Sequence, residues 1–178
     1  RTGDGIWLHG TEPSFVNRAP RASDGCLSLS NGDFLALHRL IGDATSVPVV
    51  IDPAPEWISP TELHRRREQL SRTILRWFKA RLESDTPLLD RLYSLSHRDT
   101  SVRHSSHAQP SSSFAGLAAN LRLEDKQLFA YPGEERLYVA DLWLTYGRQT
   151  KLGIRQYWHR TADDEWQIVE EFSIPPNG

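Results

Sequence analysis

The sequence is poor in several features, and each shortage excludes a class of protein. Its 178 residues include one cysteine, which excludes an internal disulfide and an all-cysteine zinc site. No apolar run approaches the roughly 20 residues that a membrane-spanning helix needs. The formal net charge of −2 provides no basic field for nucleic acid or anionic lipid. We therefore expect no membrane span and no nucleic-acid partner.

Methionine is absent altogether. Because a complete, unprocessed reading frame begins with Met, we expect a fragment, a mature product or a trimmed polypeptide, with residues missing upstream. The chain opens on strand-like sequence, without the basic and apolar zones of a signal peptide. The N-terminus therefore gives no information about localisation.

The composition suits a folded protein, and it differs between the two ends of the chain. Apolar residues make up 38% and charged residues 25%, which is enough for a buried core. Residues 4–51 are rich in Gly, Ser and Asp, whereas a proline-bearing joint at 54–58 leads into longer periodic segments. We therefore expect two domains, residues 1–54 and 55–178.

The first region contains short elements. "GIWLHG" at 5–10 predicts a brief strand, a long loop follows over 10–25, and "VPVVI" at 47–51 predicts a second short strand. A helix is expected over 30–41, with Ser30 as its N-cap and Asp33 at the third helical position, where a carboxylate suits the helix dipole.

The second region begins with a strong helix signal. Ser59-Pro60-Thr61-Glu62 is a capping-box pattern with proline at the first helical position, and it predicts a helix over 60–83. A shorter helix is expected over 87–95, with Thr86 before Pro87. A polar stretch at 96–113 indicates a loop or linker, and a short helix is expected over 114–121. Apolar residues recur at helical spacing in the first helix: Leu63, Leu70, Ile74, Trp77 and Leu82.

The remainder of the chain alternates like strands. In 137–146 every second residue is apolar or aromatic, so Tyr138, Ala140, Leu142, Leu144 and Tyr146 share one face. Residues 151–160 and 165–174 pair across the turn "TADDE", which makes Trp158, Trp166, Ile168 and Phe172 available for packing. Helices followed by an antiparallel meander predict an α+β domain in which a curved sheet wraps the long helix.

The single cysteine, Cys26, lies in a stretch that suits a nucleophile. Gly25 allows a close approach beside it, and Ser23 and Asp24 are turn formers. His9 ends the first strand and is the only histidine before Cys26, so a loop between adjacent strands can bring the two together. The alternative is that Cys26 is a small core residue and that His9 is structural.

The pattern "IWLHGT", thirteen residues from Gly10 to Ala22, then "SDGCLSL" resembles the L,D-transpeptidase catalytic domain family. The resemblance covers residues 4–51, about the last third of such a domain. It implies that Cys26 is the nucleophile and His9 its base. Gly10 falls where the family uses a backbone carbonyl or a serine to orient the imidazole, and the N–H groups of Gly25 and Cys26 become candidates for the oxyanion hole.

Three loop residues have less definite implied roles. Ser23 and Arg21 would shape the loop or contact substrate. Asp24 stands where the commonest form of the motif has histidine, and the "SDGC" form resembles that of periplasmic murein-modifying members. A carboxylate beside the nucleophile disfavours the thiolate unless it turns away or pairs with Arg21.

The resemblance also implies a reaction and a place. Cys26 would attack the L,D-peptide bond after the third residue of a peptidoglycan stem peptide, and the acyl group would pass to an amine or to water, without a metal or organic cofactor. The expected location is the periplasm or cell envelope. The alternative is a ligand-binding or dimerisation module that carries an incomplete catalytic remnant. A papain-type "C-G-S-C-W" is absent.

Residues 58–174 resemble the nuclear-transport-factor-like (SnoaL-like) cone, whose sheet here ends in "W-x-I-x-E-x-F". Such a domain implies a small-ligand pocket, a homodimer or a scaffold. Asp141, Tyr157, His159 and Glu170 are candidate pocket groups, or else satisfied surface and core residues. Elsewhere, His38 is expected on the surface, and the irregular spacing of His97, His104 and His107 favours no metal site.

Overall fold

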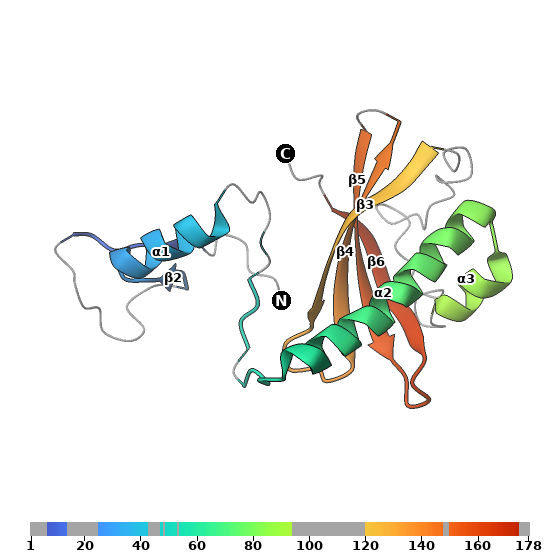
Figure 1. Cartoon of the computed structure of the whole chain (residues 1–178), viewed down its shortest axis with the longest axis horizontal. Coiled ribbons are helices and arrows are strands. Elements are labelled where there is room, and N and C mark those ends of the chain that lie inside the picture. Colours follow the sequence, from blue (N-terminus) through green and yellow to red (C-terminus); the bar gives the residue numbers. More distant parts are fainter. Residues whose placement is uncertain are drawn as a thin grey trace. The chain divides into compact units, whose positions relative to one another are not determined.

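The structure is a computed structural model of the whole chain. It forms two compact units, residues 1–48 and 49–178. Its described parts contain three helices, a two-stranded parallel ladder and a four-stranded antiparallel sheet, so the α+β class is confirmed (Figure 1). The residues that the structure describes are 7–13, 25–42, 47, 49–52, 54–93, 120–147 and 150–174.

The first unit is built from a short ladder and one helix. Strands β1 (Leu8–His9) and β2 (Leu27–Ser28) pair in parallel, and α1 (Asn31–Ile41) follows β2 directly. The predicted cap of α1 is confirmed, because Ser30 Oγ accepts a hydrogen bond from the Asp33 N–H at 3.1 Å. The acidic Asp33 lies in the first turn, where it complements the helix dipole.

The strand predicted at 47–51 is wrong. Val47 and residues 49–51 are outside any strand, and their side chains are exposed. No neighbouring strand among the described residues pairs with this segment. An apolar β-branched run has strand propensity only where it can pack on a sheet, and here it has no such surface.

Helix α2 (Pro60–Glu83) matches the predicted limits. Ser59 Oγ accepts the Glu62 N–H at 3.2 Å, as the capping pattern predicted. The Glu62 carboxylate binds the guanidinium groups of Arg65 and Arg66, each at 2.7 Å. These two cations, Arg65 first, lower the pKa of Glu62 from 4.5 to about 2.

Helix α3 (Thr86–Leu92) is shorter than the predicted 87–95 and begins differently. Its N-cap is Asp85, whose Oδ1 accepts the Leu88 N–H at 3.1 Å, while Thr86 is already within the helix. Aspartate is a better N-cap than threonine. The first turn tolerates Pro87, because N–H groups there have no partner within the helix.

The sheet has the strand order β3-β4-β5-β6, and each neighbouring pair is antiparallel. Its strands are β3 (Leu121–Ala130), β4 (Leu137–Tyr146), β5 (Thr150–Arg160) and β6 (Trp166–Ile174). The predicted strand at 137–146 and the pairing of the last two strands are confirmed. The helix predicted at 114–121 is wrong at Leu121, which begins β3, and residues 114–119 lie outside the described residues.

The core forms where α2 crosses one face of this sheet (Figure 1). Leu70, Ile74 and Trp77 of α2 pack against alternate residues of the strands, and Ile74 and Trp77 are fully buried. Leu63 was expected on the same helix face, but it is 42% exposed because it precedes the first buried turn of α2. The strand residues of this core are Ala140, Leu142, Leu144, Ile154, Trp158 and Ile168, with Tyr138 and Tyr146 at its margin.

A β-bulge changes the faces of β6. Tyr157 pairs with Glu170, but the next residue, Trp158, pairs with Ile168, which leaves Val169 as the extra residue. Simple alternation would place Ile168, Glu170 and Phe172 together. The bulge instead sends Glu170 and Phe172 to the face away from α2 and turns Glu171 toward the core.

Glu171 is the centre of a buried polar cluster between the helices and the sheet. Tyr93 Oη donates to Glu171 at 2.8 Å, and Gln156 Nε2 donates to the same carboxylate at 2.6 Å. Arg81 donates to Tyr93 Oη at 2.5 Å and lies 3.4 Å from Glu171. Burial raises the pKa of Tyr93, as does the negative charge of Glu171, so its hydroxyl remains a donor. The cluster joins the end of α3 to α2 and β6.

Replacing Ile74 with alanine tests the core. The substitution removes fully buried methyl and methylene groups and leaves a cavity, so the free energy of unfolding should fall by about 3 kcal/mol in urea denaturation. The control is Leu63→Ala on the exposed part of the same helix, which should change it by about 0.5 kcal/mol or less. Equal losses would contradict the described packing.

The Glu62 ion pairs predict a local pH dependence. The folded pKa lies below 4.5, so the carboxylate stabilises the fold above that pH, and this contribution is lost as the pH falls from 4.5 toward 2. NMR titration of the Glu62 carboxyl carbon should give a pKa of about 2. The pKa should return toward 4.5 in an Arg65→Gln/Arg66→Gln variant. A wild-type pKa near 4.5 would show that the pairs do not form in solution.

Candidate functional site

The candidate site is organised by the parallel ladder of the first unit. Leu8 pairs with Leu27 and His9 with Ser28, and Cys26 immediately precedes β2. Two backbone hydrogen bonds join the strands. The Leu27 N–H donates to Trp7 O at 2.8 Å, and the Leu29 N–H donates to His9 O at 2.9 Å. Alternate residues of an extended strand share a face, so Cys26 is expected on the face of Ser28 and His9.

The imidazole of His9 has a fixed hydrogen-bond partner. Its Nδ1 lies 2.6 Å from the carbonyl oxygen of Gly10. A carbonyl can only accept, so Nδ1 carries the proton and donates it to this bond. The neutral ring therefore keeps its lone pair on Nε2, which is the nitrogen that can act as a base.

Asn31, the first residue of α1, holds the backbone that follows His9. Its Oδ1 accepts the Thr11 N–H at 2.7 Å. A Cβ atom built on Gly10 would overlap this same oxygen, so a side chain there would displace the Asn31 amide. The sequence analysis missed Asn31. Its signal was an amide side chain at the start of the helix that directly follows the cysteine segment.

The backbone beside Cys26 also requires glycine. Gly25 has φ of +118°, a region that side chains strongly disfavour. Among the described residues, no atom lies within 4 Å of a Cβ built on Gly25. Cys26 itself is half-buried.

Ser28 is a second residue that the sequence analysis missed. It is the register partner of His9. Its Oγ is buried, and within the described part of the chain it has no hydrogen-bond partner. Buried hydroxyl groups normally have a hydrogen-bond partner, so Ser28 is a further candidate residue of this site.

Several predicted residues cannot be placed. Arg21, Ser23 and Asp24 lie outside the described residues, so the expected pairing of Asp24 with Arg21 has no structural description. The same holds for the loop histidines at 97, 104 and 107. His38 is exposed on α1, as predicted. Within the described ranges, no group of three or more His, Cys, Asp or Glu residues could hold a metal ion.

In the second unit, the four candidate pocket groups lie on the sheet face away from α2: Asp141, Tyr157, His159 and Glu170. They therefore do not line the interface between helix and sheet. Asp141 is only 3% exposed, and Arg155 binds it through two hydrogen bonds of 2.6 Å, which makes it a satisfied ion pair. The polar groups that do enter the interface belong to the Glu171 cluster. Simple alternation along β6 did not predict this cluster, because the bulge changes which residues face the core.

Comparison with known families places the first region. Residues 1–51 match the L,D-transpeptidase catalytic domain (YkuD). The match covers 51 of 178 residues, and it contains His9, Gly10, Gly25 and Cys26. The α+β region that follows is not assigned to a family by this match. A search of curated proteins found no match. Among the described helices, none has the length and apolar character to cross a membrane.

The hydrogen bond to Gly10 predicts an unusual tautomer for His9. When the His9 ring is uncharged, nitrogen-15 NMR should show its proton on Nδ1 and its lone pair on Nε2, because the carbonyl of Gly10 can bind only an N–H. The exposed His38 is the matched control and should show mainly the Nε2–H form of free imidazole. If His9 also showed mainly the Nε2–H tautomer, the hydrogen bond between Nδ1 and the Gly10 carbonyl would be contradicted.

Proposed function

We propose that this chain is part of a peptidoglycan-modifying cysteine enzyme that acts on L,D-peptide bonds of stem peptides. The observation that carries the proposal is the orientation of His9. Its Nδ1 is held by Gly10 O, and β1, which it ends, pairs with β2 directly after Cys26. Both residues lie within the segment that matches the L,D-transpeptidase catalytic domain.

The first half-reaction forms a thioester. Nε2 of His9 takes the proton of the Cys26 thiol, and the thiolate attacks the carbonyl carbon of the third stem residue, usually meso-diaminopimelate. A carbon–sulfur bond forms, and the carbonyl oxygen becomes an oxyanion that the N–H groups of Gly25 and Cys26 stabilise. When the tetrahedral intermediate collapses, the C–N bond breaks and His9 returns the proton to the leaving amine of D-alanine.

The second half-reaction consumes the acyl-enzyme. An amine that loses its proton to His9 attacks the thioester, which gives a new amide and restores the thiol. This outcome is transpeptidation. Water attacking in the same way gives a carboxylate, which is carboxypeptidase or amidase trimming. Both outcomes share the chemistry of Cys26 and His9, so the site supports the acyl-enzyme and leaves the acceptor open.

The residues around this pair receive supporting roles in the proposal. Arg21 and Ser23 shape the loop before the nucleophile or contact the stem peptide. Asp24 turns away from the thiolate or pairs with Arg21, since a free carboxylate there would oppose ionisation of Cys26. Ser28, the register partner of His9, has a buried Oγ that would bond the ring or the substrate. The reaction uses no metal or organic cofactor.

The remainder of the chain is proposed to be a second domain. Residues 1–54 would be the C-terminal part of the catalytic domain, and residues 55–178 a nuclear-transport-factor-like (SnoaL-like) cone that scaffolds or forms a homodimer. A long helix on an antiparallel sheet supports this arrangement. The location proposed from the family match is the periplasm or cell envelope.

A second candidate is a binding or dimerisation module with a catalytic remnant. One observation favours it: α1 has no buried residue, and Trp7, Leu35 and Leu40 are exposed. In the described part of the first unit, the ladder and helix therefore have no apolar core of their own. Catalytic groups need rigid support from packed side chains. The described part of the first unit would have that support only if further polypeptide covered these apolar side chains.

Substitution of the two central residues tests the enzyme. The full-length protein is incubated with muropeptides that carry tetrapeptide stems, and the products are weighed by mass spectrometry. Cys26→Ala should abolish product, and His9→Gln should slow its formation by about 1,000-fold or more, because the thiol loses its base. The matched control is His38→Gln, on an exposed face of α1, which should keep wild-type rates.

The outcomes separate the two candidates. Products that are identical for the wild type and Cys26→Ala would exclude catalysis by Cys26 and leave the binding module. A carbapenem should also acylate Cys26 of the folded wild type, and the adduct should be absent from Cys26→Ala. Failure of the wild type to form an adduct would count against an accessible, activated thiol.

A further inference from the structure

One peptide group of the first unit is held by hydrogen bonds at both of its polar atoms. The peptide between Gly10 and Thr11 is trans, so its carbonyl and its N–H point in opposite directions. The carbonyl oxygen lies 2.6 Å from Nδ1 of His9, and the N–H donates to Oδ1 of Asn31 at 2.7 Å. A chain of hydrogen bonds therefore runs from the side chain of Asn31 through this peptide to the imidazole.

The two hydrogen bonds depend on each other because the peptide group is planar. Rotation of its plane moves the carbonyl and the N–H together, so the bond to Asn31 also sets the direction of the carbonyl that faces His9. Hydrogen bonds in a chain polarise one another, and donation by the Thr11 N–H makes the Gly10 oxygen a better acceptor. The backbone before this peptide is also fixed, because His9 O accepts the Leu29 N–H at 2.9 Å.

Asn31 connects the segment of the histidine to the segment of the cysteine. It is the first residue of α1 and follows Cys26 by five positions in the sequence. The start of this helix is fixed by Ser30, whose Oγ accepts the Asp33 N–H at 3.1 Å and donates to the Asp33 carboxylate at 2.7 Å. The ladder between the two segments has only two residues in each strand, so the bond from Asn31 extends their connection beyond it.

We propose that Asn31 is a positioning residue for His9: by holding the Gly10–Thr11 peptide, it keeps the imidazole proton on Nδ1 and the lone pair on Nε2. Asn31 acts through the peptide rather than by contact with substrate. Its effect on a reaction rate rests on the proposed function, whereas its effect on the ring proton is a property of the folded chain and is measured without any reaction.

Gly10 offers a second way to break the same hydrogen bond. A Cβ atom at this position would overlap Oδ1 of Asn31, so Gly10→Ala should displace the amide. When the amide is removed by Asn31→Ala, the nearest of the contacts around that Cβ that remains is the Cα of residue 31, at 3.9 Å, which is an ordinary distance. Gly10→Ala alone should therefore shift the His9 tautomer about as far as Asn31→Ala, and the double variant should shift it no further.

Nitrogen-15 NMR of His9 in the 178-residue chain measures the effect. For the uncharged ring, Asn31→Ala should raise the ratio of the Nε2–H to the Nδ1–H tautomer about fivefold, which corresponds to the loss of one hydrogen bond. Asn31→Asp keeps an oxygen at the same position and should restore the wild-type ratio. The matched control is Ser30→Ala, which removes the cap of α1 but leaves Asn31 in place, and it should not change the ratio.

The same variants of the full-length protein are assayed with tetrapeptide muropeptides. Asn31→Ala should lower kcat about tenfold with KM nearly unchanged, because a misaligned base slows the chemical step and not substrate binding. Asn31→Asp should restore kcat. A wild type without activity would overturn the proposed function, and the NMR ratios would still decide the role of Asn31.

Three results would overturn the role proposed for Asn31. The first is a His9 tautomer ratio that is the same in Asn31→Ala and the wild type. The second is an equal shift in Ser30→Ala, which would assign the effect to the stability of α1. The third is a failure of Asn31→Asp to restore the ratio, which would show that the oxygen at this position is not the group that matters.

Discussion

The packing of α2 on the antiparallel sheet is the contact on which the second unit depends. Ile74 and Trp77 carry the apolar face of a helix that is otherwise strongly charged, and they are fully buried against β4, β5 and β6. A sheet of four strands needs such a cover on one face to be stable. The burial of the Glu171 cluster depends on the same contact, because Arg81 of α2 lies against Tyr93 and Glu171.

The first unit depends on a different kind of interaction. Its described part has a short parallel ladder and a helix without buried residues, so directional hydrogen bonds rather than apolar packing define the geometry. The bond from His9 to Gly10 and the bond from Thr11 to Asn31 orient the segment that contains His9, the proposed base. The proton transfer proposed for His9 would require such a fixed backbone geometry.

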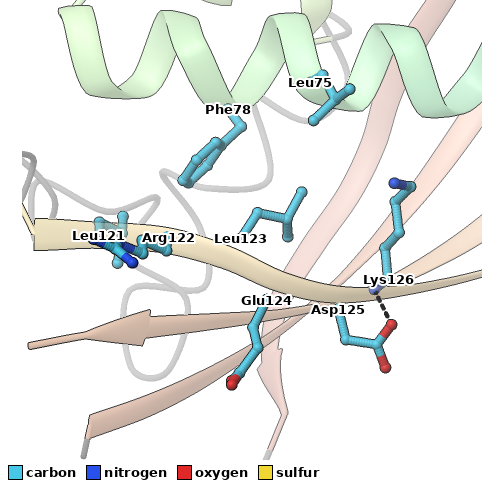
Figure 2. Close-up of a pocket in the computed structure, with 8 residues that line it drawn as sticks. All are labelled: Leu75, Phe78, Leu121, Arg122, Leu123, Glu124, Asp125 and Lys126. Atoms are coloured by element: carbon cyan, nitrogen blue, oxygen red, sulfur yellow. Dashed lines mark hydrogen bonds between the residues drawn. The ribbon is translucent and has the colours of Figure 1, made fainter. Parts of the chain in front are cut away.

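Charged groups in the sheet are neutralised in two separate ways. On one face Arg155 binds Asp141 through two hydrogen bonds. On the other, Arg81 lies 3.4 Å from the Glu171 carboxylate, which also accepts hydrogen bonds from Tyr93 and Gln156. Buried carboxylates with such complete partners serve the fold and leave little capacity for chemistry. Near the edge of the sheet, Lys126 extends toward α2, while the carboxylates of Glu124 and Asp125 point away from the helix (Figure 2).

The sequence by itself determined the features that depend on neighbouring residues. Capping at Ser59 and apolar spacing gave the limits of α2, alternation gave β4, and the motif around His9 and Cys26 indicated the candidate site. Only the tertiary structure decided which polar groups share a face. The bulge opposite Tyr157 moved Glu170 outward and Glu171 into the core, and a single extra residue of this kind leaves no periodic signal. The strand predicted at 47–51 was wrong for a related reason. A strand forms only where another strand can pair with it, and such partners come from distant parts of the chain.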